Sequence, residues 1–158
     1  MLTYRVRMSS MSNYSDLWQV IKMRVCRNNK FAESSLANSN SFDAVRVKLR
    51  ILQIFALECA LQQYRLKHGT PFNPLEGKKA LHHMIFEKTK WQLDTIRTLS
   101  LNDSLFIIND ELRLLELPPK ASDFIQGLEI GLHVHPLDDF SEEDWEPKEN
   151  STFLQTLQ

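Results

Sequence analysis

The fold of this chain is decided by residues 42–68, which read FDAVRVKLRILQIFALECALQQYRLKH. Apolar residues recur there at spacings of three and four, as one face of an α-helix requires. Ser41 or Asp43 can cap the start of the helix. Gly69, as a residue tolerant of positive φ, and Pro71 mark its end. Because further apolar residues broaden the face around much of the circumference, we expect this helix to be central and covered by neighbours.

The segments before this helix are less regular. Residues 2–8 alternate between apolar and polar side chains, which predicts a short strand. Ser15 can cap an amphipathic helix that reaches about Cys26. Residues 28–41 contain four Asn and four Ser, which predicts a loop.

After residue 68 we expect a second helix and then a small β-hairpin. Asn73 as cap and Pro74 at the first position predict a helix that ends near Asn102. Residues 105–108 and 112–117 are predicted to be two short strands. The predicted fold is therefore mainly α with a small β-hairpin, a helical domain with a winged-helix-like helix-helix-hairpin portion.

Two prolines follow the predicted hairpin, and the rest of the chain divides into two parts. Ser122 can cap a short helix that ends near Gly131. Residues 136–158 are acidic with interspersed aromatic residues, a composition typical of mobile segments that order on binding a partner. We therefore expect one helical domain over residues 1–135 and a mobile C-terminal tail whose removal leaves the fold intact.

Composition and charge limit the class of protein. The chain has 158 residues, of which 42% are hydrophobic and 25% charged, as one globular domain would have. No run reaches the roughly 20 apolar residues of a membrane span, so we expect a cytoplasmic location and no membrane contact. Residues 1–98 carry a formal charge of +9 and residues 99–158 one of −10. A split this large favours an interaction role for at least one half of the chain.

The sequence contains no convincing set of catalytic residues. With four glycines it has no phosphate-binding loop, dinucleotide-binding pattern or nucleophile elbow. His133 and His135 precede Asp138 and Asp139, but no distant Cys or His pair completes a metal site. Cys26 and Cys59 lie in apolar helical patterns and are expected to be buried. We therefore expect no enzyme activity, no metal and no cofactor.

Basic residues of the second helix suggest an alternative function. The helix-helix-hairpin order is that of winged-helix DNA-binding proteins. Salt-dependent contacts to phosphate would come from its cationic exterior. The candidate nucleic-acid-binding residues are Lys78, Lys79, Lys88, Lys90 and Arg97. The predicted hairpin is acidic, however, and phosphate would repel a wing of that charge.

Three segments carry a resemblance to a known family. They are the long helix from Phe42-Asp43 through Arg50-Ile51-Leu52, the stretch Trp91-Gln92-Leu93-Asp94, and Leu112-Arg113-Leu114-Leu115-Glu116-Leu117 before Pro118. Over residues 42–130 the chain resembles the small middle component of ABC three-component defence systems, the Lamassu type included. The resemblance implies a non-enzymatic subunit that joins an SMC-like ATPase to an effector, often a nuclease. It includes no motif from which the role of a single residue could be transferred.

The leading hypothesis is a non-catalytic adaptor subunit of a multiprotein complex in bacterial anti-phage or anti-plasmid defence. It would bind protein partners, contact DNA only through the complex, and could also self-associate. The candidate partner-binding residues are Trp18, Trp91, Asp138, Asp139, Phe140 and Trp145. The alternatives are a winged-helix-like nucleic-acid-binding protein and an immunity or antitoxin protein that blocks a toxin with an acidic surface.

Overall fold

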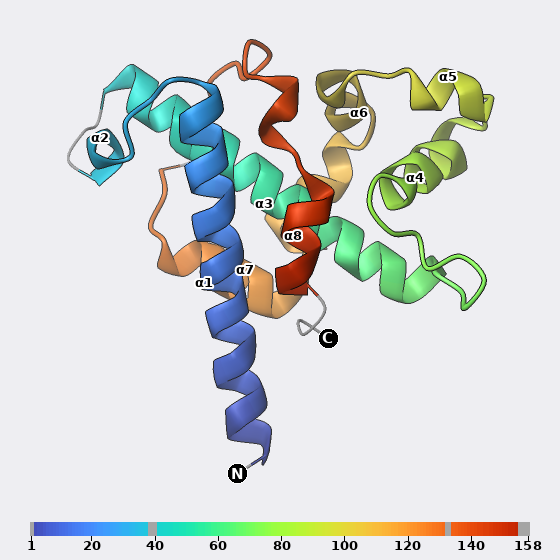
Figure 1. Ribbon diagram of the computed structural model, residues 1–158, viewed down its shortest axis with the longest axis horizontal. Helices are drawn as coiled ribbons and strands as arrows, with labels where there is room; N and C mark the ends of the chain where they lie inside the picture. The colour runs from blue at the N-terminus through green and yellow to red at the C-terminus, as the bar shows by residue number, and fades with distance from the viewer. Residues whose placement is uncertain (1, 38–40, 132–133, 155–158) are drawn as a thin grey trace.

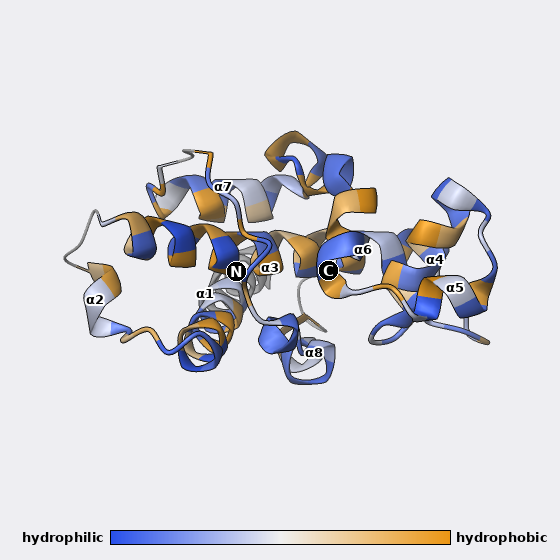
Figure 2. Ribbon diagram, turned by 90° about the horizontal axis from the view of Figure 1, so that it is seen from above, coloured by the Kyte–Doolittle hydropathy of each residue, from blue (hydrophilic) through white to orange (hydrophobic). Residues whose placement is uncertain are grey.

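The computed structural model describes residues 2–37, 41–131 and 134–154, with side chains from Asn13 onward. Within these ranges the chain is mainly helical, as expected, and forms helices α1 to α8 and three short 3₁₀ helices, η1 to η3 (Figure 1). None of the described helices combines the length and the apolar content that a bilayer crossing requires. Seen from above, α3 runs between α7 on one side and α1 and α8 on the other (Figure 2).

Helix α3 (Phe42–His68) is the central element, and the predicted bounds are confirmed. The Ser41 hydroxyl accepts a hydrogen bond from the Ala44 amide at 3.2 Å, which is the expected cap. Helices α1, α2, α4 and α8 and the 3₁₀ helix η1 all pack against α3. Phe55 and Leu61 are fully buried. The broad apolar surface of this helix is therefore covered from several sides, as its sequence predicted.

Gly69 follows α3 for a different reason from the one predicted. Its φ is −68°, so it does not use the left-handed region. A Cβ at this position would lie 2.6 Å from the Arg65 carbonyl oxygen and 3.2 Å from that of Pro74. Glycine is needed here because two backbone segments approach too closely for any side chain.

Helix α1 (Leu2–Asn28) replaces both the strand predicted over residues 2–8 and the shorter helix from residue 15. Leu17, Ile21 and Val25 recur at spacings of four and are fully buried, and α1 packs against α3. Helix α2 (Ser34–Ala37) lies inside the predicted loop. The alternation of residues 2–8 therefore predicted the wrong structure, because these residues form the first turns of α1.

The second long helix begins later than predicted. The Asn73 side chain accepts from the Leu75 amide at 3.3 Å, which forms a turn instead of a helix cap. Leu75 and Gly77 both have a φ of 61°, which interrupts any helix over residues 74–78. The Arg65 guanidinium holds the turn by donating to the Leu75 and Gly77 carbonyl oxygens, each at 2.9 Å. Helix α4 (Lys79–Thr89) starts only after this turn.

A left-handed residue divides the predicted helix once more. Lys90 has a φ of 56° and ends α4, and α5 (Leu93–Arg97) follows as a separate short helix. The apolar pattern that predicted one helix therefore belongs to two helices, α4 and α5. Trp91 lies in the connection between them.

No strand forms over residues 105–117, so the predicted β-hairpin is wrong and the described residues contain no winged-helix wing. In its place are α6 (Leu101–Ile107), η1 (Asn109–Leu112) and η2 (Leu114–Glu116). The Ser100 hydroxyl caps α6 by accepting from the Asp103 amide at 3.0 Å. Leu101, Leu105 and Ile108 follow at helical spacing and are buried.

Helix α7 (Pro119–Gly127) starts at a proline in the first turn and not at Ser122. The Ser122 hydroxyl instead donates to the Leu114 carbonyl oxygen at 2.7 Å. Phe124 of α7 packs on Phe55 with ring centroids 5.3 Å apart. This aromatic contact, which also includes Tyr14 of α1, joins α7 to the centre of the molecule.

The C-terminal segment departs most clearly from the sequence-based expectation. Residues 142–154 form η3 (Glu142–Asp144) and α8 (Pro147–Leu154), which pack against α1 and α3 (Figure 1). Phe140, Trp145 and Leu154 are buried in the same apolar core as the helices. The structure thus packs residues 140–154 of the predicted tail against the helices, where arginines of α1 and α3 pair with Asp139, Asp144 and Glu149. Residues 155–158 of that tail lie outside the described residues.

Candidate functional site

A buried ion pair lies beneath the C-terminal segment. The Arg50 Nε of α3 donates to the Asp144 Oδ2 of η3 at 2.9 Å, and neither side chain is exposed to solvent. The remaining Arg50 nitrogens donate to the Gln53 side chain and to the Ser141 carbonyl oxygen, both at 2.9 Å. The side-chain amide nitrogen of Asn29 donates to both Asp144 carboxylate oxygens, at 3.0 and 3.1 Å. Every charge in this cluster therefore has hydrogen-bond partners, as buried ions require.

Two further arginines flank the buried pair. Arg24 of α1 donates to a Glu149 oxygen at 2.5 Å from one terminal nitrogen and at 3.1 Å from Nε. Arg46 of α3 pairs with Asp139 and lies over the Phe140 ring, 5.0 Å from its centroid. The basic side chains of α1 and α3 thus bind the acidic segment along its length.

A hydrogen-bonded tryptophan completes the contact. The Trp145 Nε1 donates to the Glu58 Oε1, and both side chains are buried. Burial raises the pKa of Glu58 above its usual range, and the hydrogen bond from Trp145 opposes that rise. Within the part of the chain that the structure describes, the second Glu58 oxygen has no hydrogen-bond partner, and the buried Asn150 side chain has none either. Glu58 is therefore a buried carboxyl group that is only partly satisfied.

Four of the six predicted partner-binding residues belong to this internal contact or lie beside it. Asp139, Phe140 and Trp145 bind α3, and the Asp138 carboxylate is exposed while its backbone carbonyl accepts from Asn102 at 2.8 Å. Trp18 is half-buried against Phe55, with ring centroids 5.4 Å apart. Trp91 is the predicted partner-binding aromatic residue that is left substantially exposed.

The structure distributes the predicted nucleic-acid-binding residues over two helices and pairs several of them. Lys88 forms an ion pair with Glu111 at 2.5 Å, Lys90 with Glu87 at 3.1 Å, and Arg97 with Asp94 at 3.1 Å. Lys78 and Lys79 are exposed next to the start of α4. Carboxylates accompany three of the five basic groups, which weakens the attraction that this face offers to phosphate.

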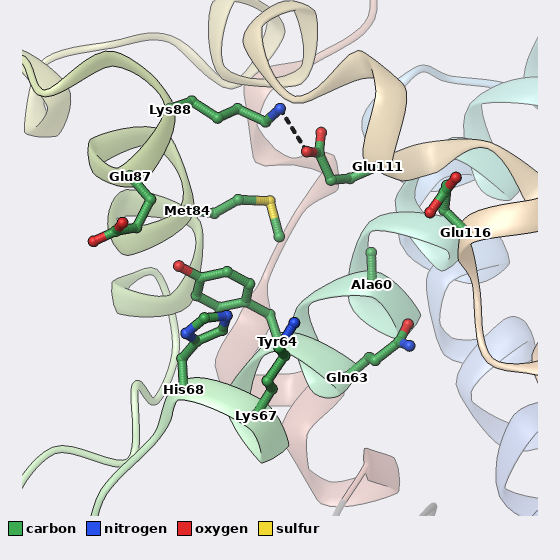
Figure 3. Close-up of a pocket in the computed structure, with 10 residues that line it drawn as sticks. All are labelled: Ala60, Gln63, Tyr64, Lys67, His68, Met84, Glu87, Lys88, Glu111 and Glu116. Carbon is green, nitrogen blue, oxygen red and sulfur yellow. Dashed lines mark ion pairs between the residues drawn. The ribbon is translucent and has the colours of Figure 1, made fainter.

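A pocket of about 320 Å³ lies between α3, α4 and the 3₁₀ helices (Figure 3). Tyr64 and His68 of α3 stack with ring centroids 4.2 Å apart. The Tyr64 hydroxyl lies 2.6 Å from the His83 Nδ1. The ion pair of Lys88 with Glu111 closes one side of the pocket (Figure 3).

Burial, assisted by the nearby Glu87, raises the pKa of Tyr64 to about 12. The phenol is therefore protonated at neutral pH and can donate its proton to a hydrogen bond with the His83 Nδ1. A general base or nucleophile would need the opposite shift. The group can orient a ligand by hydrogen bonding, and the pocket offers both positive and negative charges at its rim.

The described residues do not assemble a group of three or more metal-binding side chains. His135 packs edge-on against Phe42 with centroids 5.1 Å apart, and His133 lies outside the described residues. Cys26 and Cys59 are buried free thiols, as expected. Burial raises the pKa of both thiols, that of Cys26 to about 11, so neither is activated as a thiolate at neutral pH.

Sequence reasoning missed the paired arginines of α1 and α3 and the buried Glu58 of α3. Arg50 and Glu58 were visible as charged residues within the apolar pattern of the long helix. Charged groups on a buried face require partners. The pattern therefore indicated that Arg50 would pair with an acidic residue and that Glu58 would accept a hydrogen bond from elsewhere in the chain. Comparison of the chain with protein-family models, with curated proteins and with solved structures finds no significant match.

Proposed function

We propose that this chain is a non-catalytic adaptor that holds two different proteins together. The setting that its sequence resemblance suggests is a Lamassu-type defence complex, in which the adaptor would link an SMC-like ATPase to an effector nuclease. We place the function on exposed surfaces because the buried arginine cluster, and the Lys88–Glu111 and Tyr64–His83 pairs of the smaller pocket, bind residues of the chain itself.

The observation that carries this proposal is the exposure of large apolar side chains on and next to α5, α6 and η2. Phe106 of α6 is 82% exposed, and Leu115 of η2 is 96% exposed. Trp91 and Leu93, in and just after the α4–α5 connection, are each nearly half exposed. Single exposed apolar residues are common, and we take these four as the candidate anchors for a partner protein, which would cover them if they act as one surface.

The internal use of the acidic segment also bears on the choice among functions. Asp139, Asp144 and Glu149 pair with arginines of the same chain. They are less available for blocking a basic toxin than free carboxylates would be. An adaptor that binds through apolar residues does not require those charges.

Expression of the tagged chain together with its neighbouring genes, followed by affinity purification, tests the proposal. We expect an SMC-like ATPase and a second, different protein to be retained at defined stoichiometry. Retention of one small toxin alone would support the immunity function instead. Elution of the chain without any partner would contradict the adaptor function.

A further inference from the structure

A second pocket, of about 490 Å³, is lined in part by α2, a helix at the opposite end of the molecule from α5 (Figure 1). Four segments line it: α1, α2 with the residues just before it, α3, and residues 128–131 after α7. It is larger than the pocket beside Tyr64, and its volume falls in the range of roughly 300 to 1,000 Å³ that is usual for sites binding small molecules.

Apolar and polar groups share the walls of this pocket about equally. The larger apolar side chains among its lining residues are Trp18, Leu36, Val45, Ile51, Leu128 and Ile130. One side of the Trp18 ring is held by Phe55 and Phe124, at centroid distances of 5.4 and 6.4 Å. The indole is therefore a fixed aromatic wall, and a hydrocarbon group packed on it would lose contact with water.

Two lysines line the pocket from facing helices. Lys22 lies one turn after Trp18 on α1, and Lys48 lies one turn before Ile51 on α3. Both are half-buried, and neither has a carboxylate within ion-pair distance among the described residues. By contrast, Arg24 and Arg46 on the same two helices are paired.

Two glutamates, Glu33 and Glu129, also line the pocket, and both are exposed. Water screens an exposed carboxylate more strongly than it screens a half-buried ammonium group. The local field therefore favours a ligand with one negative charge and disfavours a multiply charged anion. An apolar body with one acidic end group matches both the walls and the lysines.

We propose that this pocket binds a small apolar monocarboxylate. The hydrocarbon body would pack on Trp18 and Ile51, and the carboxylate would accept hydrogen bonds from Lys22 and Lys48. A charge-assisted hydrogen bond of this kind is stronger than a neutral one, so the carboxylate supplies specificity and the hydrocarbon supplies most of the buried surface. Such a site would exist whether or not the chain joins two proteins.

Calorimetric titration of the full chain with decanoate tests the site, with decanol as the uncharged probe of similar length. Variants Lys22→Met and Lys48→Met keep the apolar stem and remove the charge, and Lys79→Met removes an exposed lysine elsewhere. We expect decanoate to bind the native chain and Lys79→Met equally, and each pocket variant about tenfold more weakly, a loss of about 1.4 kcal/mol. Decanol should not distinguish the four proteins.

Thermal melting of each variant shows that the fold is retained, so weaker binding can be assigned to the lost charge. The proposal is overturned if decanoate shows no saturable binding to the native chain. It is also overturned if the variant carrying both pocket substitutions binds decanoate as tightly as the native chain does.

Discussion

Arg50 and Asp144 lie 94 residues apart in the sequence and form an ion pair with no exposure to solvent. The pair connects the basic part of the chain to the acidic part. It shows that the opposite charges of the two parts are used within the molecule, where three arginines of α1 and α3 bind carboxylates of the C-terminal segment. Part of the charge asymmetry of the sequence is therefore used in folding.

Removing one member of this pair should be strongly destabilising. Asp144→Ala leaves the Arg50 guanidinium buried without its counter-ion, and we expect a loss of about 3 to 5 kcal/mol in the free energy of unfolding. Urea denaturation followed by circular dichroism measures it. Glu143→Ala, at the exposed neighbouring position, should change stability by no more than about 0.5 kcal/mol; equal effects of the two substitutions would contradict a buried pair.

Two tryptophans offer a matched comparison of burial. Trp145 is 7% exposed and hydrogen-bonded to Glu58, whereas Trp91 is 45% exposed. Trp145→Ala should cost about 3 to 5 kcal/mol, because it leaves a cavity and deprives Glu58 of a donor. Trp91→Ala should cost much less, and its effect should appear in partner binding. Similar melting temperatures for both variants would show that residues 140–154 do not pack as described.

Glu58 should make the stability of the fold dependent on pH. Its folded-state pKa is raised above the ordinary value of 4.5, so the folded chain holds this proton more tightly than the unfolded chain does. The free energy of unfolding therefore falls as pH rises from about 4.5 through the raised pKa.

Glu58→Gln keeps an acceptor for Trp145 and removes the titration. Relative to the native chain, the variant should gain stability between pH 5 and pH 8 in urea denaturation. Other titrating groups contribute equally to both proteins and cancel from the difference. A stability difference that stays constant over this range would show that Glu58 ionises at its ordinary pKa.

The exposed apolar residues should matter for partners and not for folding. Phe106→Ser combined with Leu115→Ser should leave the melting temperature nearly unchanged, since neither side chain is packed in the core. Retention of a partner in affinity purification should fall at least tenfold if these residues anchor the interface. Asp103→Ala and Arg113→Ala, at exposed polar positions nearby, are the controls. Loss of binding in the controls, or none in the double variant, would place the interface elsewhere.

Local patterns predicted some elements well and others poorly. The bounds of α3 follow from its apolar spacing, its Ser41 cap and the Gly69 break, all of which act within a few residues. The hairpin prediction failed because short apolar runs fit a strand and a helix equally well. Over residues 101–108 the helical spacing of Leu101, Leu105 and Ile108 determines the outcome. The left-handed Leu75 and Lys90, which lie before and after α4, carry no glycine or asparagine signal, although Gly77 does mark the turn before the helix.

The candidate sites were harder to predict, because they depend on contacts between distant residues. Asp144 contacts Arg50 across 94 residues of sequence, and no local spacing indicates that pairing. The lysines of the larger pocket come from different helices. Among the basic residues of this region, the pairs of Lys90 with Glu87 and of Arg97 with Asp94 have a spacing of three that the sequence shows, whereas the pair of Lys88 with Glu111 does not follow from any local spacing.

Amide hydrogen exchange over residues 140–154 of the full chain tests the central structural claim most directly. The Asp144 amide donates to Ser141 and the Asn150 amide to Glu146, within a segment that packs on α1 and α3. We predict that these amides exchange far more slowly than those of an unstructured peptide, and that Asp144→Ala abolishes the protection. Exchange at the rate of a free peptide in the native chain would contradict the docked C-terminal segment.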